Sequence, residues 1–237
     1  MEYRFIEHSG FLVESESAWL LFDYFRGEMP PLPPDKPLFV FSSHVHPDHF
    51  NFDVFRLTSA YPAVRYILSN DIHRKFNRAA FLRHGVLPDC YDERITFLSP
   101  DSTLSFPPIS IETIGSTDQG VAFIITIDGQ TVFHAGDLNL WLWEEDTQKE
   151  QADMRRRFET ELKKLSGRHF DLAFFPLDPR QEGDYPFLGI TAFLEATDTK
   201  QIVPMHCWGD ETIVSRFFSR FFSAEKAGQK EACGKED

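Results

Sequence analysis

The sequence predicts a layered α+β protein, and two features support this prediction. Between Arg94 and Ala135, short apolar runs alternate with polar residues at a period of two, which is typical of strands with one buried face. After residue 147, helical patterns alternate with the apolar runs 172–177 and 201–205. Helices packed against two mainly antiparallel sheets form a layered sandwich, so we expect that architecture.

Length and composition indicate an ordinary globular chain. The 237 residues suffice for one well-buried core, and we expect a single domain over residues 1–225 followed by a polar, frayed tail over 226–237. The net charge of −13 disfavours nucleic acid as a partner. Three cysteines without CxxC spacing, and no apolar run long enough to span a membrane, predict a soluble protein without a membrane segment, located in the cytoplasm.

In the first half of the chain we expect a hairpin, a surface loop and then alternating strands and helices. The hairpin spans residues 3–22 and turns at Ser9-Gly10. Five prolines between residues 26 and 37 exclude a helix or a central strand there. The elements expected next are a strand at 38–41, a helix at 50–61, a strand at 64–68, and a helix that Asp71 caps and Gly85 closes.

The second half begins with strands and ends with helices. Asp128-Gly129 is a strong hairpin signal between two of these strands. A helix over 147–165 has one apolar face, and the phenylalanines of the last helix predict docking on a sheet. The expected order is strands 95–98, 109–114, 121–127 and 131–134, helix 147–165, strand 172–177, helix 190–196, strand 201–205 and helix 211–224.

Four side chains of the metal-ligand type follow the strand at 38–41. His44 and His46 are two residues apart and therefore point to the same side as the chain leaves the sheet. Pro47 ends the strand, and Asp48 and His49 follow in the turn. Imidazole and carboxylate groups are ligands for zinc, iron and manganese. The alternative to a metal site is a polar strand end with exposed histidines. We consider it less favourable, because clustered histidines repel one another when protonated.

The pattern His44-x-His46-x-Asp48-His49 resembles the signature of the metallo-β-lactamase superfamily. This resemblance implies a four-layer αββα sandwich and a hydrolase that uses a metal-activated water, with Asp48 as the catalytic residue. Asp137, after a strand and a glycine, is similar to the aspartate that bridges two metals in that superfamily. His206, at another strand end, is similar to its last ligand. The metal ligands we expect are His44, His46, Asp48, His49, Asp137 and His206.

One ligand that the resemblance implies is missing. Such families usually carry a histidine in the loop before the bridging aspartate, and the corresponding loop here, 115–120, contains none. Asp118 or a water is the substitute we consider, and His134 is either a further ligand or a packed strand histidine. We expect one tightly held ion, alone or with a weaker second, with zinc favoured over manganese or iron. Asp23 resembles a residue that supports the metal loop, and a turn-forming role is the alternative.

Several further residues are candidates for substrate contact. His8 resembles an N-terminal histidine of relatives of the N-acyl-phosphatidylethanolamine phospholipase and ascorbate-lactonase types, where it would support the centre or touch substrate. Trp141 and Trp143 would wall a pocket or simply pack. Arg180, with Tyr185 in the same region, would pair with an anionic substrate group, and a structural salt bridge is the alternative.

The function expected from these features is metal-dependent hydrolysis of a small ester, lactone or phosphodiester. The alternatives are a metal-binding sensor or interaction domain without catalysis, which the missing loop histidine motivates, and a redox protein with a di-iron centre. Because one fold supports many chemistries, the sequence leaves the substrate and the oligomeric state open.

Overall fold

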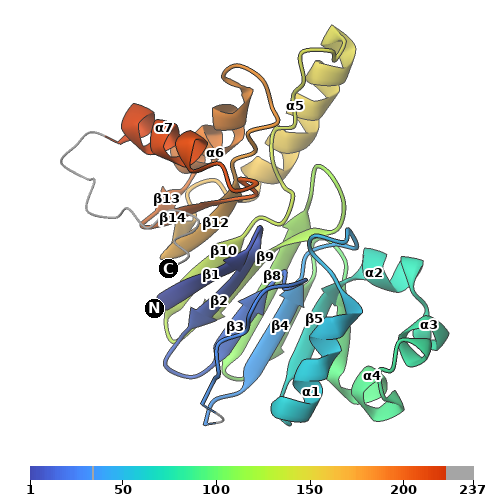
Figure 1. Ribbon diagram of the computed structural model, residues 1–237. Helices are drawn as coiled ribbons and strands as arrows, with labels where there is room; N and C mark the ends of the chain where they lie inside the picture. The colour runs from blue at the N-terminus through green and yellow to red at the C-terminus, as the bar shows by residue number, and fades with distance from the viewer. Residues whose placement is uncertain (34, 223–237) are drawn as a thin grey trace.

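Two six-stranded sheets packed face to face form the centre of the protein (Figure 1). The computed structural model describes residues 1–33 and 35–222. The first sheet contains, in spatial order, β1 (Glu2–Glu7), β2 (Gly10–Glu14), β3 (Trp19–Phe22), β4 (Leu38–Ser42), β5 (Arg65–Ser69) and β6 (Ile95–Leu98). The second contains, in spatial order, β14 (Ile202–Met205), β12 (Leu172–Pro176), β10 (Gln130–His134), β9 (Val121–Ile127), β8 (Ile109–Gly115) and β7 (Thr103–Phe106). A parallel ribbon joins β11 (His169–Phe170) to β13 (Asp198–Thr199).

Helices cover the outer face of each sheet (Figure 1). The first sheet carries η1 (Phe52–Arg56), α1 (Leu57–Ala60), α2 (Asn70–Lys75), α3 (Arg78–Arg83) and α4 (Pro88–Arg94). The second carries α5 (Gln148–Lys163), α6 (Tyr185–Ala196) and α7 (Glu211–Phe221). The predicted αββα sandwich is therefore confirmed.

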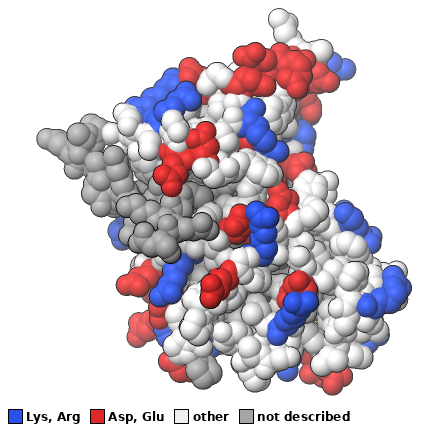
Figure 2. All heavy atoms as spheres, viewed as in Figure 1, with Lys and Arg blue, Asp and Glu red and all other residues white. Residues whose placement is uncertain are grey.

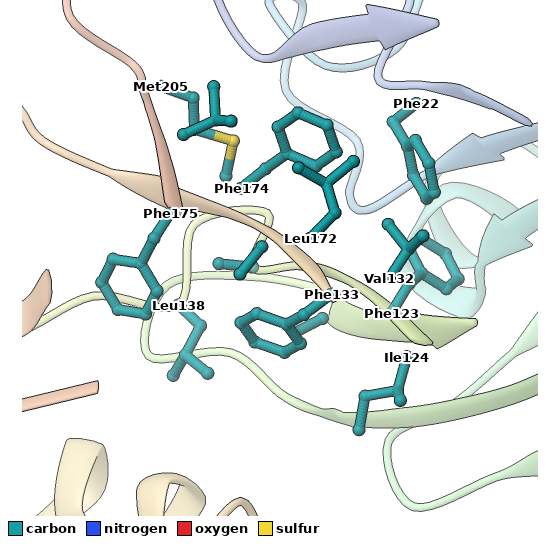
Figure 3. Packing of buried hydrophobic residues seen from close by; sticks show 14 of the residues in the cluster. Phe22, Phe123, Ile124, Val132, Phe133, Leu138, Leu172, Phe174, Phe175 and Met205 are labelled. Atoms are coloured by element: carbon teal, nitrogen blue, oxygen red, sulfur yellow. The ribbon is translucent and has the colours of Figure 1, made fainter. Parts of the chain in front are cut away.

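Alternation of side chains along the strands produces the layers. Phe174 of β12 stacks on Phe11 of the first sheet, with ring centroids 4.2 Å apart. Its neighbour Phe175 stacks on Phe193 of α6 at 4.9 Å. Figure 3 shows Phe174 and Phe175 pointing to opposite sides of their strand. Because both faces are buried, β12 is apolar throughout instead of alternating with polar residues.

Strand direction brings the polar loops together at one edge of the sandwich. In the first sheet β3 and β4 are parallel, and β1 runs the same way because β2 is antiparallel to both of its neighbours. In the second sheet β10, β12 and β14 are parallel, and β8 shares their direction. The residues that follow these strand ends are His8, Asp23, the loop 43–50, Asp118, Asp137, Asp178 and His206.

Some predicted elements differ from the observed ones. The single helix predicted from Asp71 to Gly85 is two helices, because Phe76 has an extended backbone and Asn77 caps α3 through the backbone N–H of Ala80. Asp71 is not a helix cap, since its carboxylate instead accepts a hydrogen bond from the backbone N–H of Val45.

Other boundaries also shift. The helix predicted at 50–61 begins as a 3₁₀ turn, η1, before α1. The helix predicted at 190–196 begins earlier, at Tyr185, with a proline in its first turn. The short elements β7 and α4 were not predicted, because four and seven residues are too few to establish a period. The predicted tail, 226–237, lies outside the described residues.

Gly120 permits a close backbone contact between the two sheets. Its φ is +73°, and a Cβ there would lie 2.0 Å from the carbonyl oxygen of Ser43. The next residue, Val121, donates its N–H to that same oxygen at 2.9 Å. Any side chain at position 120 would therefore displace the loop that carries the histidines.

Gly120→Ala is expected to destabilise the fold far more than Gly129→Ala. Gly129 has almost the same φ, +74°, but a Cβ there meets nothing within 4 Å. The control should cost about 1–2 kcal/mol for the left-handed backbone alone, and Gly120→Ala should exceed it by roughly 2 kcal/mol or more because backbone must move. Urea unfolding of both variants measures this difference. Equal losses of unfolding free energy would show that the contact between Gly120 and Ser43 does not contribute to stability.

Candidate metal centre

Two groups of histidine and aspartate side chains meet at the edge where the strands end. One group is His8, Asp48, His49 and His206, and the other is His44, His46, Asp118 and Asp137. Within each group the potential ligand atoms all lie within 4.8 Å of one another. Donors of one tetrahedral zinc ion, each about 2.1 Å from the metal, lie about 3.4 Å apart, so both groups are close to the spacing that a metal ion needs.

Asp137 lies between the two groups. Its Oδ1 is 3.2 Å from Nε2 of His49 and 3.6 Å from Nε2 of His206. Its Oδ2 is 3.3 Å from Nε2 of His44. Burial raises the pKa of Asp137, but the neighbouring His49, His44 and His206 outweigh burial and hold that pKa well below its usual value. A buried, ionised carboxylate thus presents one oxygen to each group.

Buried atoms without hydrogen-bond partners indicate that these side chains suit a cation. Among the described residues, Nε2 of His8, Nε2 of His49 and Oδ1 of Asp137 are buried and make no hydrogen bond. Leaving such atoms unsatisfied costs about 1–3 kcal/mol each. All three lie around one group of donors, and a metal ion at that point would satisfy them together.

Asp23, at the end of β3, fixes the orientation of His49. Its Oδ2 is 2.7 Å from Nδ1 of His49 and accepts a hydrogen bond from the Ser43 hydroxyl at 2.6 Å, while Oδ1 accepts the backbone N–H of Ser43 at 2.7 Å. With Nδ1 held by a carboxylate, Nε2 of His49 is directed toward Asp137. The Ser43 hydroxyl also contacts Nδ1 of His44 at 3.0 Å.

Asp178 has the same relation to His206. The sequence indicated a substrate role for the segment Asp178-Pro179-Arg180 but did not predict this contact. Its Oδ2 lies 2.8 Å from Nδ1 of His206, and the guanidinium of Arg180 donates to both of its oxygens. Although burial raises the pKa of Asp178, His206 and Arg180 lower it to about 2. The available signal was positional, because Asp178 follows a buried strand end just as Asp137 does.

The loop without a histidine places Asp118 in one of the groups. Oδ2 of Asp118 lies 3.4 Å from Nδ1 of His46, which is itself 3.0 Å from Nε2 of His44. The preceding residue, Thr117, is fixed because its hydroxyl accepts the backbone N–H of Asn139 and its carbonyl accepts a hydrogen bond from Arg157. Asp118 therefore places a carboxylate beside His46, in the loop where the family resemblance implied a histidine.

His134 belongs to neither group. Its Nε2 is 3.0 Å from the carbonyl oxygen of Ser9, and its Nδ1 accepts the backbone N–H of Gly136 at 3.2 Å. Burial lowers its pKa, so the ring is neutral and both nitrogens are used. Of the two alternatives for His134, these hydrogen bonds favour the packed strand histidine, because both ring nitrogens already have a partner. The residue instead links β10 to the turn that carries His8.

Trp141 connects the candidate centre to a neighbouring cavity. Its indole N–H donates to the carbonyl oxygen of Asp137 at 2.9 Å, and its ring centroid is 5.7 Å from that of His206. Trp143 stacks on Trp141 with an angle of 8° between the rings. Both tryptophans line a cavity of about 560 Å³ against the first turns of α5. Figure 2 shows acidic side chains gathered in this region of the surface.

Arg180 and Trp208 form another wall beside the centre. The guanidinium of Arg180 lies 4.6 Å from the ring centroid of Trp208, whose own ring is 4.6 Å from that of His8. Trp208 is 51% exposed, and sequence reasoning missed it. Tyr185 instead contacts Gln151 of α5 through its hydroxyl, and it belongs to neither donor group.

The metal-free protein should lose stability as the pH rises. Burial disfavours protonation of His44, but Asp137, Asp23 and Asp71 outweigh burial and raise its pKa from 6.5 to about 9. A raised pKa contributes stability that is present below pH 6.5 and is lost as the pH rises through 9. We expect a loss on the order of 3 kcal/mol in unfolding free energy over this range. Urea unfolding of the chelated protein at several pH values measures this loss. If the unfolding free energy of His44→Gln fell with pH as steeply as that of the parent, His44 would not be its cause.

The fold and the donor groups define a protein with the metallo-β-lactamase fold, in which histidines and aspartates gather where strands of both sheets end. The chain belongs to the beta-lactamase superfamily: the family described as "Beta-lactamase superfamily domain" matches residues 2–154.

Relatives and solved structures agree with this assignment. The chain is 27% identical over 230 residues to a "UPF0173 metal-dependent hydrolase" of Opitutus terrae, covering 87% of this chain and 84% of the relative. The metallo-beta-lactamase fold protein YhfI from Bacillus subtilis has a TM-score of 0.59 and 16% identity, covering 91% of this chain and 86% of that one. The diiron beta-hydroxylase CmlA from Streptomyces venezuelae has a TM-score of 0.57 and 13% identity, covering 86% of this chain and 44% of that longer one. Among the described residues, no helix is long and apolar enough to cross a membrane.

Proposed function

We propose that this protein is a metal-dependent hydrolase with two neighbouring ion positions that share Asp137. The observation that carries the proposal is the placement of the two Asp137 oxygens, one toward His49 and His206 and the other toward His44. The name of the Opitutus relative agrees with this activity.

Asp137 belongs to both ion positions, and each of the other donors belongs to one of them. Asp48, His49, His206 and Asp137 would hold one ion, and His44, His46, Asp118 and Asp137 would hold the other. Asp23 and Asp178 orient His49 and His206 through their Nδ1 atoms. Imidazole and carboxylate donors suit zinc, iron and manganese, so elemental analysis has to decide between them.

Asp48 is the residue we assign to proton transfer. A bound metal lowers the pKa of water and polarises a carbonyl or phosphoryl oxygen. Burial raises the pKa of Asp48, but His8 and His49 hold it below its usual value, so the carboxylate is ionised at neutral pH. About a third of its side chain is exposed (31%), which leaves it able to orient a water and accept its proton.

The surroundings favour a small substrate such as an ester, a lactone or a phosphodiester. Arg180, held by Asp178 against Trp208, offers a fixed cation beside the centre for an anionic group. The net charge of −13 and the exposed Glu144, Glu145 and Glu150 near the Trp143 cavity disfavour nucleic acid. The buried thiols of Cys90 and Cys207 fit a reducing compartment such as the cytoplasm.

Metal analysis and a substrate panel test this function together. Protein purified without added metal should contain at least about one equivalent of a transition metal, and it should hydrolyse some of the lactones, phosphodiesters or thioesters offered. Asp48→Asn and His206→Ala should abolish that rate, whereas Asp53→Asn, at an exposed carboxylate on η1, should keep it. A parent without metal, or variants that match the parent on every substrate, would refute the hydrolase and favour a non-catalytic role.

A further inference from the structure

The turn between β1 and β2 brings His8 into the candidate centre. Its side chain is only 5% exposed, and Nε2 lies 3.4 Å from Oδ2 of Asp48. Within the described part of the chain that nitrogen forms no hydrogen bond. The His8 ring is 4.1 Å from the ring of His206 and 5.7 Å from that of His49. A buried nitrogen that lies beside Asp48 without a well-formed hydrogen bond is therefore directed into a set of metal donors.

The backbone around His8 is fixed by the same strands that position the other donors. The carbonyl oxygen of His8 accepts the backbone N–H of His206 at 3.3 Å. The carbonyl oxygen of Ser9 is 3.0 Å from Nε2 of His134, which lies in β10 just before Asp137. His8 also has a left-handed backbone, with a φ of 55°, which is uncommon for a residue with a side chain. These contacts hold the imidazole in place at some conformational cost.

We propose that Nε2 of His8 is a further protein donor to the ion held by Asp48, His49 and His206. The proposal rests on the metal centre of the proposed function. With Asp137, this position would have five protein donors, whereas the position of His44, His46 and Asp118 would have four. Structural zinc sites are almost always four-coordinate, so a fifth protein donor shifts the preference toward iron or manganese. Metal binding would also add a link between the turn of the N-terminal hairpin and the loops that carry the other donors.

Cobalt(II) provides a probe that reports coordination as well as affinity, because four-coordinate cobalt absorbs visible light more strongly than five- or six-coordinate cobalt. His8→Gly removes the imidazole and suits the left-handed backbone. We expect chelated protein carrying His8→Gly to bind its first cobalt at least about 100-fold more weakly than the parent, with a more intense spectrum. Free imidazole should restore both properties. His73→Ala, at an exposed histidine of α2, should match the parent in both.

Hydrogen exchange gives a second readout in a milder variant. His8→Asn keeps a residue that tolerates positive φ while shortening the reach of the side chain. Cobalt should slow exchange in residues 2–14 of the parent but not of His8→Asn, and it should protect the loop 43–50 in both.

The outcomes separate the two proposals. If His8→Gly bound its first cobalt with an affinity within about threefold of the parent, the role of His8 as a donor would be overturned. A reduced cobalt affinity with an unchanged spectrum would overturn it as well, and either result would leave the rest of the centre intact. Failure of the parent itself to bind cobalt would instead overturn the metal centre, and His8 with it.

Discussion

Asp137→Asn is expected to remove metal from both positions and to lower kcat/KM by a factor on the order of a thousand or more. The reason is that one carboxylate faces both groups, with Oδ1 beside His49 and His206 and Oδ2 beside His44. An amide carries no charge and presents an NH₂ group, which cannot bind a cation, to one of the two positions. Without bound metal, water keeps its ordinary pKa and hydrolysis loses its nucleophile. Elemental analysis and steady-state rates on the best substrate measure both effects.

A matched control separates loss of charge from loss of a shared ligand. Asp146 lies in the loop that follows Asp137, where it accepts the backbone N–H of Trp143 at 3.0 Å and belongs to neither donor group. Asp146→Asn should therefore keep the metal content and rate of the parent. If Asp137→Asn retained one full equivalent of metal, Asp137 would serve only one position and the shared-ligand arrangement would be wrong.

The sequence could predict the layers and several donors because both depend on local patterns. Runs such as Leu38–Ser42, buried on both sides, predict strands covered by two layers. Asp137 and His206 each follow a strand, and parallel strands end at the same edge of a sheet. The density of possible donors from His44 to His49 predicts a metal site at that edge, where the structure places both candidate donor groups.

The remaining features depend on contacts between segments far apart in the sequence. Asp71 looks like a helix cap, but it supports the metal loop through Val45 because α2 begins close to that loop. Asp178 lies next to a strand end, and only the pairing of β12 with β14 shows that it reaches His206. The sequence left His134 as either a ligand or a packed strand histidine, and only its contact with the turn at Ser9 favours the second role. No local pattern shows these contacts.

Asp118→Ala is expected to remove one of the two ions and leave the other. Asp118 touches His46 and belongs only to the group of His44, His46 and Asp137. Its loss leaves three protein donors there, whereas the donors around His49 and His206 are unchanged. We expect metal content to fall from about two equivalents to about one, and the rate to fall roughly 100-fold if both ions act on the substrate. Metal titration with a competing chelator distinguishes the two positions.

The companion variant Asp118→His tests whether this aspartate stands in for the loop histidine of the superfamily. An imidazole on the same loop would still offer a donor to the ion beside His46, so Asp118→His should retain about two equivalents of metal. It also removes one negative charge, so the second ion should bind with a changed preference among zinc, manganese and iron. Asp89→Ala, at an exposed carboxylate of α4, should alter neither. If Asp118→Ala instead kept both ions, water would suffice in place of Asp118, and the carboxylate beside His46 would be a surface contact without a metal role.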